Sequence, residues 1–370
     1  MSRILSAPSF VPRKIFIEDA VKNSNLTTRI VNAFPDKPRE HLADATILLN
    51  HAQQDQNKNN WRDALLLAKQ RGPFVRLCPG TQKHICCLYH NLDLAAGCDL
   101  GCTYCILQGY LNNPLITLYA NMDDMYDELH NLLSKNPQRF YRIGTGELSD
   151  SLTFDHITHL ARELVAFFSD KKNAIIELKS KNIHIDDILH LNHNKRTVMS
   201  WSLNSQVIAE KEESRAAPLD DRLRAAREAQ SAGFRIGFHF DPMIEHQDWQ
   251  DGYRKIVDRI FDKIHPESIA WISLGALRYP SAFDEIIRAN HPQSDIVLGE
   301  LLPGIDKKLR YFEPIRIEMF SKMHEWIKSY SKDVFVYLCM ESSSVWRKAF
   351  GWSPKNSAHL KQLLDERVKV

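Results

Sequence analysis

Short apolar runs alternate with longer amphipathic stretches along most of the chain after residue 89. The apolar runs have the length of buried strands and cover residues 90–95, 140–143, 174–178, 197–203, 235–240, 269–274 and 334–338. The amphipathic stretches between them have helical spacing and cover residues 122–134, 157–168, 219–232, 251–264 and 316–330. Pro218 and Gly233 bracket the third of these stretches, as the start and end of a helix require. Such an order predicts a parallel sheet built from β/α units.

The residues before this region follow a different pattern. Residues 61–70 (WRDALLLAKQ) have helical spacing, and the polar residues 53–60 predict a loop before them. We therefore expect an α/β fold with three parts, namely an N-terminal extension with a Cys-rich loop (1–88), a partial (β/α)6 barrel (89–345), and a C-terminal tail (346–370) after the last α/β elements. In such barrels, catalytic groups lie at the C-terminal ends of the strands.

Composition limits the class of protein without identifying it. The chain has 44% hydrophobic and 25% charged residues, as soluble globular proteins do. Its 48 basic and 46 acidic residues do not indicate a nucleic-acid binder, although a local basic patch would not change the total much. No apolar run approaches the roughly 20 residues of a membrane span, and the N-terminus lacks the apolar core of a secretory signal. We expect a cytoplasmic location and no membrane contact.

Cysteines give the strongest chemical signal. Six of the seven fall between residues 78 and 105, which in a reducing cytoplasm indicates metal binding or catalysis rather than disulfides. Cys98, Cys102 and Cys105 have the spacing C-x3-C-x2-C and follow a predicted strand, while Gly97 and Gly101 allow the loop to curl. Three thiolates on one loop predict a [4Fe–4S] cluster with one iron left open. The alternatives are a four-ligand zinc site, with a fourth thiolate from elsewhere, or structural thiols.

This spacing, with Tyr104 before the last cysteine, resembles the signature of the radical S-adenosylmethionine superfamily. The resemblance implies that S-adenosylmethionine binds the open iron and is cleaved to a 5′-deoxyadenosyl radical. It also implies an electron donor such as flavodoxin or ferredoxin. We include Tyr104 among the candidate catalytic residues.

Polar residues at the ends of the predicted strands are candidates for binding this cofactor. The segment Gly144, Thr145, Gly146 and Glu147 resembles the superfamily's Gly-Gly-Glu motif, which holds the methionine amine, and Ser149 follows it. A simple turn with a solvated glutamate is the alternative. Further hydroxyl, amide and ammonium groups that could bind the cofactor's carboxylate and ribose are those of Lys181, Ser202 and Asn204, unless they are ordinary loop polarity.

A longer set of motifs is similar to the spore photoproduct lyase family. It comprises residues 10–18 (FVPRKIFIE), Leu107-Gln108, Leu148-Ser-Asp150, residues 180–181, 202–205, 221–226, 232–238, 242–244 and 249–253. This resemblance implies repair of a methylene-bridged thymine dimer in DNA by C–C bond cleavage. It also implies a cysteine that returns a hydrogen to the product radical and a tyrosine after the last cluster cysteine. Here those two positions are Glu147 and Ile106, so that both parts of the relay are altered.

Several residues stay open to more than one interpretation. Cys339 ends the last predicted strand, where it is either a replacement hydrogen donor or a buried core thiol. Cys78, Cys86 and Cys87 are structural or redox thiols, or metal ligands. Basic residues beside aromatic ones, which could contact DNA or simply be solvated, are Lys307, Lys308 and Arg310 with Tyr311, and Arg278 with Tyr279. A paralogue acting on another nucleic acid, a peptide or a small molecule, and a non-enzymatic zinc- or cluster-binding protein, are the remaining hypotheses. The oligomeric state is not indicated.

Overall fold

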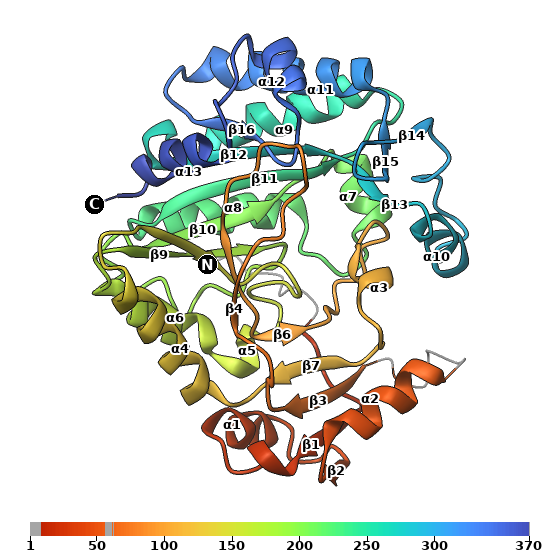
Figure 1. Ribbon diagram of the computed structural model, residues 1–370, viewed down its shortest axis with the longest axis vertical. Coiled ribbons are helices and arrows are strands. Elements are labelled where there is room, and N and C mark those ends of the chain that lie inside the picture. Colours follow the sequence, from red (N-terminus) through yellow and green to blue (C-terminus); the bar gives the residue numbers. More distant parts are fainter. Residues whose placement is uncertain (1–8, 56–60, 62, 370) are drawn as a thin grey trace.

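The predicted parallel sheet is present in the computed structural model, which describes residues 9–55, 61 and 63–369. In spatial order its eight strands are β16 (Val336–Leu338), β12 (Ile269–Ala276), β11 (Arg235–Met243), β10 (Thr197–Ser202), β9 (Ala174–Ser180), β8 (Tyr141–Gly144), β5 (His90–Leu92) and β4 (Val75–Leu77). Neighbours from β16 to β5 run parallel, and β4 pairs antiparallel at the edge. The sheet curls into a half-barrel (Figure 1). All seven predicted strand regions contribute to it, which confirms the predicted partial barrel.

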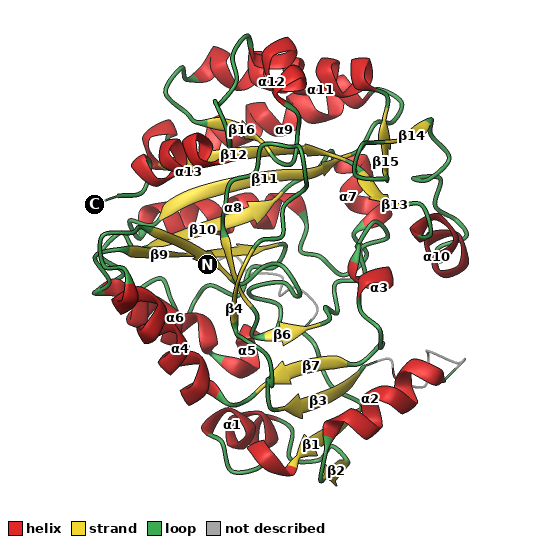
Figure 2. Ribbon diagram, viewed as in Figure 1, coloured by secondary structure: helices red, strands yellow, loops and turns green. Residues whose placement is uncertain are grey.

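Helices cover the convex face of this sheet (Figure 2). The five predicted helical stretches form α4 (Met122–Lys135), α5 (Asp155–Thr158) with α6 (Leu160–Ser169), α8 (Leu219–Ser231), α9 (Trp249–Lys263) and α11 (Glu313–Tyr330). The second stretch is split because His159 has a left-handed backbone, with φ of 50°. The other helices after β5 are α3 (Leu107–Tyr110), α7 (Gln206–Glu212), α10 (Phe283–Asn290), α12 (Ser343–Phe350) and α13 (Ser357–Glu366), with a 3-10 turn at Pro266–Ser268.

A second, five-stranded sheet lies below the half-barrel in Figure 1. Its spatial order is β2 (Arg39–Leu42), β1 (Lys14–Glu18), β3 (Ala64–Ala68), β7 (Ile116–Tyr119) and β6 (Ala95–Ala96), with α1 (Asn25–Ala33), α2 (Ala45–Gln54) and the 3-10 turn Asp19–Val21 packed around it. The helix predicted over 61–70 was wrong. Leu65 and Leu67 pack into one core and Leu66 into another, so that β3 is buried on both faces and lacks the polar alternation that marks a strand. The predicted polar loop falls largely outside the described residues, and α2 extends to Gln54.

The strand predicted over 90–95 is also different, because it divides between the two sheets. β5 belongs to the half-barrel, whereas β6 pairs antiparallel with β7 in the small sheet. The sheets therefore do not divide at residue 88, since β4 lies in the large sheet and β6 and β7 lie in the small one. The three-cysteine loop begins at β6, so its position is set by the small sheet as well as by the barrel.

A third sheet, of three antiparallel strands, lies beside the half-barrel. It contains β13 (Arg278–Pro280), β15 (Lys308–Tyr311) and β14 (Leu301–Pro303) in that order. It follows β12 and precedes α11, which places it at the rim where β12 ends. Among the described residues, no helix has the length and apolarity needed to cross a bilayer.

Candidate functional site

The three predicted cluster cysteines lie on one short loop between β6 and α3. Gly97 and Gly101 both have positive φ, of 94° and 64°, which L-residues with side chains rarely adopt. A side chain at Gly97 would also approach the backbone of Ile116 in β7 to about 3.3 Å. The two glycines therefore turn the chain between Cys98 and Cys102 while the loop stays packed on the small sheet.

The segment after α7 holds this loop from the other side. Thr103 N donates to Glu212 O at 2.9 Å, and Cys102 forms a bridge with Glu213. The Tyr104 hydroxyl donates to the Glu213 carboxylate, whose second oxygen accepts from Arg222 Nη2. Because these side chains are buried, the Tyr104–Glu213–Arg222 chain fixes the base of the loop. The role of Tyr104 in catalysis stays a prediction. Glu213 was not predicted, because nothing in its local sequence distinguishes it, and Arg222 lies in the family-like segment 221–226 but was given no role of its own.

Electrostatics in the loop suit a metal cluster. Burial raises the pKa of all three thiols, that of Cys102 to about 12, so they become thiolates only beside strong positive charge. Lys181 lies near Cys102; burial alone would lower the pKa of Lys181, but attraction to Cys102 and Glu213 raises it. Cys105 interacts electrostatically with Cys98 and Cys102, so the three thiols are neighbours.

The donor set fits a four-iron cluster. In the described part of the chain, no three His, Cys, Asp or Glu side chains converge as they would around a single ion. Each thiolate of a [4Fe–4S] cube binds a different iron, so the three thiols of the loop need not converge on one point. Cys98, Cys102 and Cys105 would hold such a cluster.

The segment after β8 places predicted cofactor-binding residues beside the cysteine loop. Both lie at the end of the half-barrel where its parallel strands terminate, here called the mouth. Gly97 N donates to Leu148 O at 2.9 Å, which ties the cysteine loop to this segment. Glu147 is exposed, and the buried Ser149 Oγ has no hydrogen-bond partner among the described residues. The Thr145 hydroxyl differs from that of Ser149 because it already has a hydrogen-bond partner: it donates to Ser151 Oγ at 2.7 Å. Glu147 and Ser149 are therefore the side chains of this segment that could contact a ligand.

The two glycines of this segment lie against side chains of neighbouring segments, and their role in cofactor binding stays a prediction. A side chain at Gly144 would collide with the Tyr89 hydroxyl, and one at Gly146 would approach Lys179 to about 3.0 Å. Both glycines thus accommodate neighbouring side chains of the protein.

Asp150 joins the ends of β8 and β9. Its carboxylate accepts from Ser180 Oγ and from Lys181 N, each at 2.7 Å. Lys181 Nζ lies 5.3 Å from the centre of the Tyr104 ring, so its ammonium group is directed toward the cysteine loop. Lys181 therefore lies beside the cysteine loop, and its role in cofactor binding stays a prediction.

Ser202 and Asn204 lie at the end of β10 but are less accessible. Both are buried, and the Ser202 carbonyl accepts from Arg222 Nη1 at 2.9 Å. Asn204 Nδ2 donates to Pro242 O at 3.0 Å, and its Oδ1 accepts from the Tyr253 hydroxyl. The amide of Asn204 therefore connects β10 to the end of β11, and its role in cofactor binding stays a prediction.

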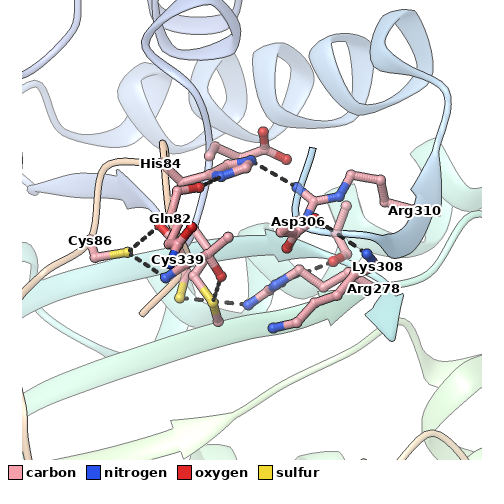
Figure 3. A network of polar contacts seen from close by, with 12 residues as sticks. Gln82, His84, Cys86, Arg278, Asp306, Lys308, Arg310 and Cys339 are labelled. Carbon is pink, nitrogen blue, oxygen red and sulfur yellow. Dashed lines mark hydrogen bonds and ion pairs between the residues drawn. The ribbon is translucent and has the colours of Figure 1, made fainter. Parts of the chain in front are cut away.

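The far side of the mouth holds an ion pair that the sequence did not reveal. Arg278 binds both carboxylate oxygens of Asp241, at 3.0 and 3.1 Å, and its Nη2 lies 3.7 Å from Cys339 Sγ (Figure 3). A side chain at Gly275 would lie within 3 Å of both partners. Burial raises the pKa of Cys339 well above its usual value, and Asp241 adds to this, so the thiol stays protonated. Cys339 thus lies at the mouth, as its position at the end of the last strand predicted.

A buried polar network lies on the concave face below the mouth. Glu177 of β9 accepts from Ser200, from His239 Nε2 at 2.9 Å and from Trp271 Nε1 at 3.0 Å. Burial opposes the charge of Glu177, but His239 and the donated hydrogen bonds outweigh it and lower the pKa of Glu177 to about 2. Three successive strands beyond β9 supply these donors, so the cluster around Glu177 connects four neighbouring strands by hydrogen bonds.

The predicted nucleic-acid residues differ in accessibility. Arg310 is buried, and it pairs with Asp306 at 2.6 Å and with His84 Nε2 at 3.1 Å (Figure 3). Tyr311 and Tyr279 are buried, and Arg278 is engaged in the ion pair above. Lys307 is exposed and Lys308 is half-buried at the same hairpin. The lysines are therefore the members of this set that a partner would reach.

Comparisons with known proteins agree with this architecture. The family model described as Spore photoproduct lyase matches residues 79–311. The spore photoproduct lyases of Bacillus subtilis (strain 168) and Geobacillus sp. (strain Y412MC61) are 27% and 26% identical over 215 and 214 residues. Each match covers 57% of this chain and 63% of the relative, and thus less than two thirds of the relative's length.

Solved structures extend the likeness in fold. A spore photoproduct lyase complexed with dinucleoside spore photoproduct has a TM-score of 0.78 at 20% identity, and covers 89% of this chain and 99% of its own. A double mutant of the lyase with bound AdoMet and the dinucleoside spore photoproduct has a TM-score of 0.79 at 21% identity, with the same coverage. The family match spans well over half of the chain and includes the cysteine loop. This chain therefore belongs to the spore photoproduct lyase family of the radical S-adenosylmethionine superfamily.

Proposed function

We propose that this protein is a radical S-adenosylmethionine enzyme that cleaves a C–C bond in a DNA photolesion of the thymine-dimer type. The observation that carries the proposal is the three-thiol loop at the mouth of the half-barrel. The Lys181 ammonium group is directed toward this loop, and the bond from Gly97 N to Leu148 O ties the loop to the segment of Glu147. The family supports the substrate class, because relatives have been solved with the dinucleoside spore photoproduct.

The cofactors supply the radical, and residues at the mouth would bind them. A [4Fe–4S] cluster on Cys98, Cys102 and Cys105, with S-adenosylmethionine on its open iron, supplies a 5′-deoxyadenosyl radical when reduced by a one-electron donor of the flavodoxin or ferredoxin class. Glu147 would accept hydrogen bonds from the methionine ammonium, and Ser149 would donate to its carboxylate. Lys181 would hold positive charge beside the cluster thiolates.

Cys339 is our candidate for the hydrogen donor. Its S–H bond breaks as a C–H bond forms on the product radical, and the unpaired electron stays on sulfur. The raised pKa of Cys339 supports this role, because only a protonated thiol carries the hydrogen. Glu147 occupies the position of the family's donor cysteine, and a carboxylate cannot give a hydrogen atom in this way.

DNA would approach the rim that carries the β14–β15 hairpin. Lys307 and Lys308 could pair with phosphates there, and Ile305 is 71% exposed between them and β14. An exposed apolar side chain flanked by lysines is an arrangement that separates bases as a nucleotide is extruded.

A different substrate is the second candidate, and the altered relay favours it. Ile106 replaces the tyrosine after the last cluster cysteine as well, so both relay positions differ from the family pattern. Such a paralogue would use the same radical on another nucleic acid, a peptide or a small molecule.

The test is anaerobic incubation of reconstituted, reduced enzyme with S-adenosylmethionine and a synthetic thymine dimer. We expect 5′-deoxyadenosine and two repaired thymines. Formation of 5′-deoxyadenosine without repair would reject the lesion and leave the second candidate. Absence of 5′-deoxyadenosine from cluster-loaded protein would reject the radical chemistry altogether and leave a binding protein.

A further inference from the structure

Residues 78–88, here called the strap, join the two edges of the half-barrel. The strap connects β4 to β5 at one edge of the large sheet, while β16 is the opposite edge. Ile85 N donates to Glu341 O at 2.9 Å, and the Thr81 hydroxyl donates to Met340 Sδ at 3.0 Å. The strap therefore crosses the open side of the half-barrel and is bonded to the chain just after β16 (Figures 1 and 3).

This contact brings the segments of two cysteines together. Ile85 and Glu341 form an isolated antiparallel bridge. Cys87 lies two residues after Ile85, and Cys339 lies two residues before Glu341, so the bridge holds the segments that carry the two cysteines side by side. The charge of Cys87 acts on the thiol of Cys339, in agreement with this placement.

The two thiols have suitable access and chemistry. Both are partly exposed, in contrast to the buried Cys102. Arg278 Nη2 lies 3.7 Å from Cys339 Sγ, where a guanidinium stabilises the thiolate that exchange chemistry needs. Asp241 holds this guanidinium by two hydrogen bonds. Cys339 can therefore carry its proton in the resting protein and still react as a thiolate in thiol–disulfide exchange.

Cys86 gives a contrast within the same strap. Successive side chains of an extended segment point to opposite sides, so Cys86 faces away from Cys87. Its sulfur lies 3.3 Å from Thr81 N, and its own N–H donates to Ser357 Oγ at 3.0 Å. Cys86 is thus directed into the strap and toward α13 rather than toward Cys339.

We propose that Cys87 and Cys339 form a redox-active pair that interconverts between two thiols and a disulfide. A thiolate of the pair attacks a low-molecular-weight disulfide such as oxidised glutathione, forming a mixed disulfide and releasing one glutathione. The second thiol then attacks the mixed disulfide, which forms the Cys87–Cys339 bond and releases the second glutathione. Both protons leave with the two glutathione thiols, and a dithiol reverses the reaction.

The link between this pair and activity rests on the proposed function. If Cys339 is the hydrogen donor, the disulfide removes its S–H bond and stops product formation. The cluster thiols lie on a separate loop, so 5′-deoxyadenosine formation continues. The oxidised strap therefore uncouples cofactor cleavage from product formation.

The test uses cluster-loaded protein in anaerobic glutathione buffers from reducing to oxidising, without substrate. Free thiols are alkylated, and cross-linked peptides are identified by mass spectrometry. We expect a Cys87–Cys339 cross-link that dithiothreitol reverses. Cys87→Ser and Cys339→Ser each remove one of the two sulfurs, so the remaining thiol should be recovered free or as a mixed disulfide with glutathione and not cross-linked to another cysteine. Cys86→Ser should form the Cys87–Cys339 cross-link as the wild type does.

Two outcomes would overturn the pair. One is a wild-type protein that takes up glutathione at these cysteines without cross-linking them. The other is a cross-link from Cys339 to Cys78 or Cys86 in place of Cys87. The cross-link in the wild-type protein is measured without any substitution, so it does not depend on whether a variant folds. Because it is read without substrate, failure of lesion repair would leave it intact.

Discussion

The cysteines of this chain form two groups at the mouth of the barrel, and the groups are built in different ways. Cys98, Cys102 and Cys105 share one loop of eight residues, and local glycines set its shape. Cys87 and Cys339 are 252 residues apart in sequence, and their segments lie side by side only because the strap crosses from one sheet edge to the other. A cofactor that must bind the same way each time is held by a local motif. The thiols proposed for transfer and exchange are brought together by tertiary structure.

The largest expected difference between the groups is in cluster loading. Cys98→Ala, Cys102→Ala and Cys105→Ala should each abolish the cluster, because each removes one of three protein ligands. Cys86→Ala should load as the wild type does, since the strap supplies no ligand. Iron and sulfide analysis with electron paramagnetic resonance after anaerobic reconstitution makes the measurement. Loss of the cluster from Cys86→Ala would join the two groups into one site.

The next difference is in the reaction step that depends on each group, namely cofactor cleavage for the cysteine loop and hydrogen return to the product for Cys339. Cys339→Ala should lower product formation by about a hundredfold or more while 5′-deoxyadenosine forms at close to the wild-type rate. The reason is that the variant keeps the cofactor loop intact but has no S–H bond to give. Cys86→Ala is the matched control, because that thiol belongs to the same strap but contacts Thr81 within it. Equal product yields in Cys339→Ala and wild type would exclude it as donor.

A third experiment destabilises the support of the cysteine loop and leaves the strap unchanged. Glu213→Ala leaves Arg222 buried without its partner, which typically costs about 3–5 kcal/mol. It also releases Tyr104, so the cysteine loop should load its cluster poorly while the strap thiols still cross-link. Denaturant unfolding and iron content report the two effects. Arg254→Ala, which breaks an exposed helical ion pair, should leave the unfolding free energy close to that of the wild type.

The sequence predicted the features that depend on neighbouring residues, and it missed those that depend on contacts between residues far apart in the chain. The seven strand regions and the cysteine loop follow from apolar runs and from spacing. β3 was misread because a strand buried on both faces shows no polar alternation. Glu213, Asp241 and Glu177 have no motif around them, since their partners lie on other strands.

Gly144 shows the same limit within a recognised motif. Its spacing identified the segment, but not the Tyr89 hydroxyl with which a side chain at this position would collide. The spacing of a motif thus places a residue at the mouth, whereas the group that it contacts is decided by a strand that the motif does not include.

The smallest expected effect concerns Glu147, which is exposed and acts electrostatically on Cys78 and Tyr89. Glu147→Gln keeps the size of the side chain but removes the charge that would pair with the methionine ammonium. We expect the Kd for S-adenosylmethionine to rise about tenfold, equivalent to about 1.4 kcal/mol. Cluster content and the Cys87–Cys339 cross-link should not change, because Glu147 bonds to neither group. Calorimetric titration of the cluster-loaded variant measures the affinity, and Lys307→Gln is the control on the distant hairpin. An unchanged Kd would assign the site of the methionine amine to another group and leave Glu147 as a solvated residue of the turn.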